Sequence, residues 1–175
     1  MSMSESHEDP PPPPKITALV ATRNRGASVA LTVKTLLAND HPDFAVLVVD
    51  QSTNDDTEDS IQGHLDDPRF TYLRTDTVGK GRAINLGCSL IESPYVAFTD
   101  DDCEIPSDWM QIMSDILDAH PKVCILFTNV VAAEHDSSAG FVPDYVRTDD
   151  VHVTSITGKL RARGIGAGMA ARREA

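Results

Sequence analysis

Three adjacent carboxylates, Asp100, Asp101 and Asp102, directly follow the apolar segment 95–99. Neighbouring carboxylates repel one another, so such a run is favoured where a cation or a positive group lies close by. Their hard oxygens suit Mg²⁺ or Mn²⁺, which take one or two protein carboxylates together with water and ligand phosphates. The triplet therefore predicts a divalent-cation site that holds a diphosphate. The alternative is a solvated acidic turn that caps the next helix.

A further carboxylate, Asp50, ends the apolar segment 44–49 and lies two residues before Ser52. A carboxylate there can accept hydrogen bonds from a ribose or from a base N–H. The alternative is a structural turn, because Asp and Ser both bond the backbone of turns. Position alone does not decide between the two, and we take Asp50 and Ser52 as candidate nucleotide-binding residues.

Cations and hydrogen-bond donors gather in two other segments. The first, after the apolar segment 16–21, comprises Thr22, Arg23, Asn24 and Arg25. The second, within 79–85, supplies Lys80, Arg82 and Asn85. Guanidinium groups and helix N-termini both favour anions, so these segments are candidates for holding a base or phosphates. Neither has the spacing of a phosphate loop or a dinucleotide motif, and ordinary surface loops would look similar.

The elements that must position these residues alternate along the chain. Short apolar segments predict strands at 16–21, 44–49, 70–73, 95–99 and 123–131. Apolar residues at helical spacing predict helices near 29–37, 56–65, 83–91 and 108–119, the last capped by Ser107. This alternation is typical of an α/β fold with a Rossmann-like, mostly parallel sheet and helices on both faces. Because ligands bind beyond the carboxyl ends of such strands, the polar clusters should converge on one rim.

The composition fits one acidic domain. The chain has 175 residues, is 41% apolar and carries a net charge of -12, which opposes binding to nucleic-acid phosphates. Its three cysteines lack CxxC spacing, which argues against a disulfide framework or a structural zinc site. We expect no transmembrane segment and a cytoplasmic location, free or peripheral to a membrane. The run Pro10–Pro14 predicts a disordered leader over 1–14, ahead of one domain over 15–175.

Four segments, taken in order, resemble the family 2 glycosyltransferases. They are 19–25 (LVATRNR), 48–57 (VVDQSTNDDT), 79–87 (GKGRAINLG) and 95–102 (YVAFTDDD). The glycine-rich segment 164–173 is similar to the family's entry into its acceptor half. The resemblance covers the chain from Lys15 onward. It implies a GT-A fold and a metal-dependent, inverting transfer from a nucleotide-diphosphate sugar to a glycan, lipid or small-molecule acceptor, with Mg²⁺ or Mn²⁺ as cofactor.

The resemblance also implies roles for matching positions. Asp50 would contact the base, and the nucleotide pocket would be lined by Thr22, Arg23 and Arg25. Asp100 and Asp102 match the D-x-D motif and would hold the metal, with Asp100 nearer the ribose. Lys80, Arg82 and Asn85 would lie near the donor. Position 51 is often acidic in the family, and Gln51 here would alter contacts to the base or ribose.

Inverting members of the family carry an acidic general base downstream, commonly in a Glu-Asp pair, which deprotonates the acceptor hydroxyl. No such pair stands between the acidic triplet and Ala175. We therefore expect an incomplete acceptor half and a general base beyond Ala175. Two alternatives stay open: a truncated, non-catalytic homologue that binds nucleotide or a partner, and a sugar-nucleotidyltransferase. The latter should carry a glycine-rich loop after its first strand, where Thr22 to Gly26 stands instead.

Overall fold

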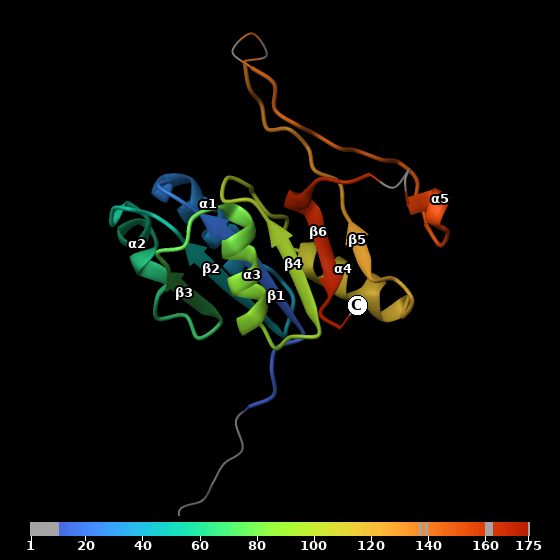
Figure 1. The fold of residues 1–175 in the computed structure, drawn as a ribbon, viewed down its shortest axis with the longest axis horizontal. Helices are drawn as coiled ribbons and strands as arrows, with labels where there is room; N and C mark the ends of the chain where they lie inside the picture. The colour runs from blue at the N-terminus through green and yellow to red at the C-terminus, as the bar shows by residue number, and fades with distance from the viewer. Residues whose placement is uncertain (1–10, 137, 139, 160–162, 175) are drawn as a thin grey trace, which may run out of the picture.

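Strands and helices alternate in the computed structural model, which describes residues 11–136, 138, 140–159 and 163–174 (Figure 1). The strands are β1 (Ile16–Thr22), β2 (Phe44–Asp50), β3 (Phe70–Arg74), β4 (Tyr95–Thr99), β5 (Ile125–Phe127) and β6 (Met169–Arg172). The helices are α1 (Gly26–Leu37), α2 (Asp56–Ile61), α3 (Lys80–Leu90), α4 (Trp109–Ala119) and α5 (Ile156–Lys159). Short 3-10 turns lie at Gln62–His64 and Gly166–Gly168. Most of the leader expected over 1–14 lies outside the described residues.

All six strands join one sheet in the order β3-β2-β1-β4-β6-β5. β1 pairs in parallel with β2 and β4, and β2 pairs in parallel with β3. β6 pairs antiparallel with both of its neighbours, β4 and β5. The register aligns Thr22 with Asp50, so β1 and β2 end together, and it aligns Val20 with Thr99, so β4 ends two residues earlier at the same edge. The predicted α/β class and mostly parallel sheet are confirmed.

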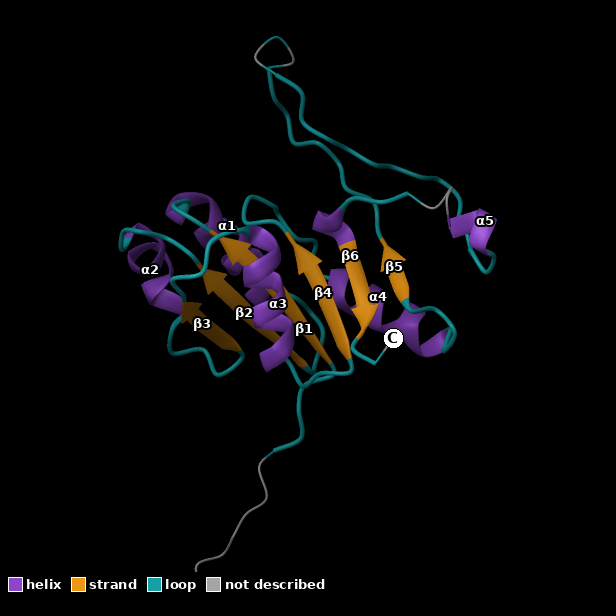
Figure 2. Ribbon diagram, viewed as in Figure 1, coloured by secondary structure: helices purple, strands orange, loops and turns teal. Residues whose placement is uncertain are grey.

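Helices cover the two faces of the sheet unequally (Figure 2). One face packs against α1, α2 and α4, and its core includes Val33, Ile61 and Met113. The other face packs against α3, around Leu19 and Ala83, in a smaller core. Because the central strands are buried on both sides, their sequences are almost continuously apolar. The expected placement of helices on both faces is confirmed.

The strand expected over 123–131 is shorter than predicted. It is limited to β5, and the chain leaves the sheet after Phe127. Val130 instead forms an isolated antiparallel bridge with Tyr145, and the Asn129 amide bonds the Arg147 backbone at 3.0 and 2.8 Å. The returning chain thus satisfies backbone groups that the sequence pattern assigned to the sheet. This excursion between β5 and β6 extends away from the sheet in Figure 1.

β6 occupies a place in the sheet that the sequence pattern did not indicate. It lies between β4 and β5, and Arg172 at its end packs its guanidinium 5.2 Å from the Tyr95 ring centroid. Arg172 also donates hydrogen bonds to the carbonyls of Leu117 and His120 at the end of α4, and to Val123. These bonds satisfy carbonyls that a helix C-terminus leaves without partners. The side chain therefore joins the sheet to α4.

The prediction that Ser107 caps α4 is wrong. Asp108 occupies the N-cap position, and no side chain forms a cap hydrogen bond there. The Ser107 hydroxyl donates to Asp40 at 2.6 Å, and the Ser107 carbonyl accepts from the Asp40 amide at 2.7 Å. Ser107 is therefore bound to the loop after α1, and its hydroxyl is not available to the helix.

Candidate functional site

The carboxyl ends of β1, β2 and β4 bring the predicted polar clusters to one rim of the sheet. Thr22 and Asp101 lie 79 residues apart in the chain, and the Thr22 hydroxyl donates to an Asp101 carboxylate oxygen at 2.7 Å. Asn24, after β1, donates its backbone N–H to the Ser52 hydroxyl at 2.7 Å. The convergence expected from a parallel sheet is therefore present in the structure.

Two basic side chains pair with the three carboxylates of the acidic triplet. Arg25 donates to Asp101 at 2.9 Å and to Asp102 at 2.7 Å, and Lys80 pairs with Asp100. The Asp101 side chain is 8% exposed, whereas those of Asp100 and Asp102 are 35% and 49% exposed. The hydrogen bond to Asp102 is the main cause that raises the pKa of Arg25, with the charges of the other two carboxylates adding to it. The repulsion among the three carboxylates is thus offset by Arg25 and by Lys80.

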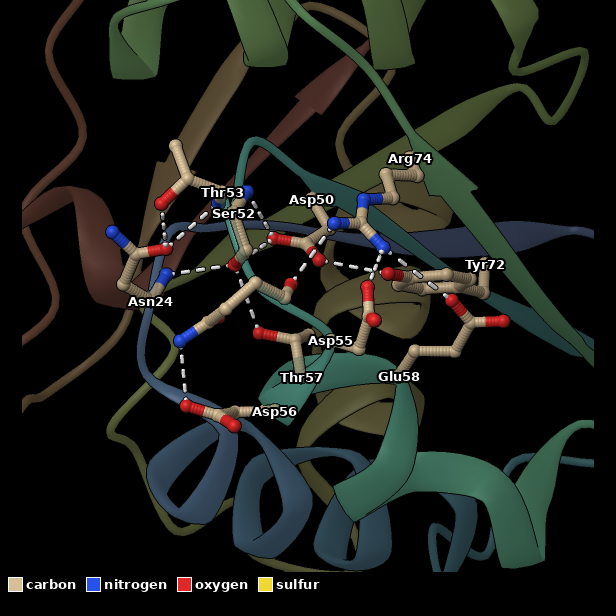
Figure 3. A network of polar contacts seen from close by, with 11 residues as sticks. Asn24, Asp50, Ser52, Thr53, Asp55, Asp56, Thr57, Glu58, Tyr72 and Arg74 are labelled. Carbon is tan, nitrogen blue, oxygen red and sulfur yellow. Dashed lines mark hydrogen bonds and ion pairs between the residues drawn. The ribbon is translucent and has the colours of Figure 1, made fainter.

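Asp50 is fully buried at the centre of a second network, shown in Figure 3. One of its carboxylate oxygens accepts hydrogen bonds from the Ser52 backbone N–H at 2.8 Å and from the Ser52 hydroxyl. The other accepts from the Tyr72 hydroxyl at 2.7 Å. Burial and the bond to Asp50 raise the pKa of Tyr72, so its hydroxyl keeps its proton and remains a donor.

The same network fixes the turns around Asp50. The Ser52 hydroxyl lies 3.0 Å from that of Thr57, at the start of α2. Asn24 adopts a positive φ of 55°, and its side-chain oxygen accepts from the Thr53 N–H at 2.9 Å. Asn tolerates this left-handed conformation better than most residues. The turns after β1 and β2 are therefore held against each other, as Figure 3 shows.

Gln51 has a role that its position in the sequence did not indicate. Its side-chain nitrogen donates to the Thr77 hydroxyl at 2.8 Å and to the Gly79 carbonyl at 3.3 Å, while its oxygen accepts from the Gly79 N–H at 3.2 Å. Gly79, which Gln51 contacts, has a positive φ of 108°. In the sequence, only the presence of a glycine just before a predicted helix could have indicated this contact.

Three of the candidate residues extend from the rim without a side-chain partner among the residues described. Arg23 follows β1 directly, while Arg82 and Asn85 lie in the first two turns of α3. All three side chains are exposed. Arg23 and Arg82 thus carry positive charges that pair with no carboxylate of the described chain.

The chemistry of the triplet fits a divalent cation that arrives with its ligand. Asp100 and Asp102 supply hard carboxylate oxygens and are partly exposed. Within the described residues, no group of three or more His, Cys, Asp or Glu side chains is arranged to hold a metal ion. A cation bound here would therefore complete its coordination with water or with phosphate oxygens, as Mg²⁺ commonly does.

A membrane-crossing helix is absent from the part of the chain that the structure describes, since none of its helices is both long and apolar enough. The longest of them, α1, has 12 residues, whereas a span needs about 20.

Known proteins match both the sequence and the fold. The family model described as glycosyl transferase family 2 matches residues 17–166. GalNAc(5)-diNAcBac-PP-undecaprenol beta-1,3-glucosyltransferase of Campylobacter jejuni is 30% identical over 97 residues, which cover 54% of this chain and 31% of that protein. An uncharacterized glycosyltransferase of Rickettsia conorii is 28% identical over 98 residues, which cover 56% of this chain and 16% of that protein.

Solved structures share the arrangement of the sheet and helices. S. aureus TarS 1-349 in complex with UDP-GlcNAc superposes with a TM-score of 0.76 at 20% identity, covering 91% of this chain and 45% of that one. The mannosyltransferase PcManGT from Pyrobaculum calidifontis, in complex with GDP-Man and Mn²⁺, gives a TM-score of 0.58 at 26% identity, covering 67% and 36%. The fold is therefore of the GT-A type that the motifs predicted.

This chain spans less than half the length of each of these four proteins. The matched residues 17–166 nevertheless include the whole rim, from Thr22 through Asp50 to the acidic triplet. The family model also covers well over half of the chain. The chain belongs to glycosyl transferase family 2.

Proposed function

We propose that this chain forms the donor-binding part of a glycosyltransferase and binds a nucleotide-diphosphate sugar with Mg²⁺ or Mn²⁺. The observation that carries the proposal is the rim itself. Carboxylates and cations from β1, β2, β4 and α3 meet there, and Arg25 joins two of them across the strand ends. The complexes of TarS with UDP-GlcNAc and of PcManGT with GDP-Man and Mn²⁺ support a nucleotide sugar as the ligand.

The triplet and its basic partners provide the groups that a diphosphate needs. Asp100 and Asp102 would hold the cation, which when bound neutralises the diphosphate and stabilises the leaving group. Lys80 and Arg25 are positioned to exchange their carboxylate partners for phosphate oxygens, which bind guanidinium and ammonium groups strongly. The exposed Arg23, Arg82 and Asn85 would add further donors for the ligand. Asp101, which is buried, would hold Arg25 and Thr22 in place.

Asp50 and Ser52 would serve the nucleoside end of the donor. Asp50 orders the turn that carries Ser52, and one of its oxygens accepts a single hydrogen bond, from Tyr72. A carboxylate oxygen can accept two hydrogen bonds, so that oxygen keeps capacity for a base N–H. Because Asp50 is fully buried, such a contact requires the Ser52 turn or Tyr72 to shift when the nucleotide enters.

The reaction we propose is transfer with inversion at the anomeric carbon. The acceptor hydroxyl attacks in line as the nucleoside diphosphate leaves, and a base takes the hydroxyl proton. The described residues supply the donor side of this reaction. We assign none of them as the general base.

Titration calorimetry of this chain with UDP, GDP and dTDP, each with and without Mn²⁺, tests the proposal. We expect one of these nucleotides to bind, and Mn²⁺ to strengthen the binding. Asp102→Ala should remove the strengthening by Mn²⁺, because it deletes a partly exposed metal-binding carboxylate. Asp108→Ala is the matched control, since Asp108 is exposed and forms no cap hydrogen bond. A folded chain that binds no nucleotide would contradict the proposal, as would Mn²⁺ dependence that survives in Asp102→Ala.

A further inference from the structure

Gln51 connects two segments of the rim that come from different strands. It directly follows β2, is 6% exposed, and its backbone N–H donates to the Thr22 carbonyl at 3.0 Å. Its side-chain amide reaches the loop between β3 and α3, where it bonds both the N–H and the carbonyl of Gly79. The Gln51 side chain thus bonds both backbone polar groups of Gly79.

Gly79 is the residue from which α3 begins. It is the N-cap of the helix, with φ 108° and ψ 133°, and its carbonyl accepts from the N–H groups of Arg82 at 2.9 Å and Ala83 at 3.2 Å. A side chain at this φ would strain the backbone. The next residue, Lys80, pairs with Asp100. The Gln51 amide therefore holds Gly79, the residue whose position determines where Lys80 lies.

The amide group is suited to this contact in a way that a carboxylate is not. An amide has a donor for the Gly79 carbonyl and an acceptor for the Gly79 N–H, whereas an ionised carboxylate only accepts. A carboxylate at position 51 would keep the bond from the N–H but would set its other oxygen against the carbonyl. Gln and Glu have the same size, so they separate hydrogen bonding from shape at this position.

We propose that Gln51 is a positioning residue, which holds Gly79 and so keeps Lys80 at the acidic triplet, ready for the donor diphosphate. The inference rests on the proposed function for its ligand. The contact itself does not depend on the ligand, because it is given by the hydrogen bonds of Gln51 with Thr77 and Gly79. Gln51 acts through Lys80 and does not itself touch the diphosphate.

Amide hydrogen exchange of Gly79 tests the contact without any ligand. In Gln51→Met, which keeps the length of the side chain and removes its hydrogen bonds, we expect the Gly79 N–H to exchange roughly tenfold faster. Gln111→Met is the matched control, because the Gln111 amide bonds Asp115 on its own helix, away from the rim. Unchanged exchange at Gly79 in a folded Gln51→Met protein overturns the inference.

A double-mutant cycle tests whether Gln51 acts through Lys80. With whichever of UDP, GDP and dTDP the wild-type chain binds, in the presence of Mn²⁺, Gln51→Met and Lys80→Ala should each weaken binding about five- to tenfold. The double variant should bind no more weakly than Lys80→Ala alone, because the position of an absent ammonium no longer matters. Additive losses would show that Gln51 acts independently of Lys80 and would overturn the inference.

Gln51→Glu provides a second variant of the same shape. We expect its nucleotide affinity to fall toward that of Gln51→Met, and wild-type affinity in Gln51→Glu would contradict a role for the amide donor. If the wild-type chain binds none of UDP, GDP and dTDP, the proposed function is the part that fails. The exchange of the Gly79 N–H then still decides whether Gln51 holds the loop.

Discussion

Asp50 has a structural part in the rim in addition to the contact with the nucleoside that we propose for it. The carboxylate is fully buried, and the donors around it are the neutral groups of Ser52 and Tyr72. A buried carboxylate is costly unless its oxygens accept hydrogen bonds, so these donors are a condition for Asp50 to stay in place. The turn of Ser52, which contacts Asn24 after β1, depends on the same bonds.

Removing one of these donors should therefore lower the free energy of unfolding. Tyr72→Phe takes away the hydroxyl that donates to Asp50 and leaves a buried carboxylate oxygen without its partner. We expect the free energy of unfolding to fall by about 1–3 kcal/mol, measured by urea denaturation. Tyr145→Phe, in the excursion between β5 and β6, is the control and should change it by less than about 0.5 kcal/mol. Equal losses in the two variants would contradict this account of Asp50.

At the scale of elements, the sequence predicted the central strands because burial on both faces leaves a nearly continuous apolar signal. β1, β2 and β4 all carry it, and the acidic triplet and Asp50 could be placed at strand ends for that reason. β6 carries no such signal, since its residues Met169–Arg172 are small apart from the two at its ends. Its place is given by its pairing with β4 and β5 and by the bond of Arg172 to the Leu117 carbonyl of α4, which are contacts between segments that no local pattern contains.

Local sequence patterns also did not predict which residues of the site pair with one another. The triplet itself was evident from its residue types, but the pairing of Arg25 with two of its carboxylates depends on the register of β1 with β4. The contact of Gln51 with Gly79 depends on the loop after β3 returning to the end of β2. Local sequence thus identifies the groups, and the packing of strands decides which of them meet.

The approach of α1 to α2 gives a prediction of its own. A Cβ added to Gly26, the first residue of α1, would lie 2.3 Å from the Asp56 carbonyl oxygen, which is backbone of α2. A Cβ at Gly87 in α3 would lie 2.4 Å from a methyl carbon of Leu19, which belongs to a side chain and not to backbone. Backbone cannot move aside as readily as a side chain, so Gly26→Ala should destabilise the protein more than Gly87→Ala.

We expect Gly26→Ala to lower the free energy of unfolding by about 3 kcal/mol or more, and Gly87→Ala by about 1–2 kcal/mol. Gly63→Ala is the control, because a Cβ there would meet nothing within 4 Å. Its effect should stay within about 0.5 kcal/mol. Urea denaturation of the three variants ranks them directly, and a reversed order of Gly26 and Gly87 would contradict the close contact of α1 with α2.

Across the whole molecule, charged groups gather at both ends of the sheet, with different consequences. At the carboxyl end they surround a rim that carries exposed cations and partly exposed carboxylates. At the other end, Lys15 pairs with Asp118, which also accepts from the Tyr95 hydroxyl at 2.6 Å, and Arg172 donates to that hydroxyl at 3.3 Å. These bonds join β1, β4, α4 and β6 to one another. The first set forms the site proposed for the donor, and the second holds the elements together.

A buried histidine near this second set makes stability depend on pH. His41 is 5% exposed; its Nδ1 accepts from the Asp43 N–H at 3.0 Å, and its Nε2 lies 3.1 Å from the Ser114 hydroxyl. This pattern requires the neutral ring with its proton on Nε2. Burial is the main cause that lowers the pKa of His41, with Lys15 acting in the same direction and Asp43 and Asp115 opposing it. The unfolded chain therefore binds a proton at this residue more readily than the folded one.

The stability that His41 contributes is fully present above its unfolded pKa of about 6.5, and it is lost as the pH falls from there through the lower folded pKa. We expect the free energy of unfolding to fall between pH 6.5 and 5 with a slope of up to about 1.4 kcal/mol per pH unit. His41→Gln should flatten this slope, because the side chain no longer titrates, whereas His135→Gln, in the exposed excursion, should keep it. The bond to Lys15 lowers the pKa of Asp118. The stability that this carboxylate contributes is therefore lost only below about pH 4, outside this window. Urea denaturation at half-unit steps of pH measures the slopes, and the same slope in wild type and His41→Gln would contradict the neutral, buried state of this ring.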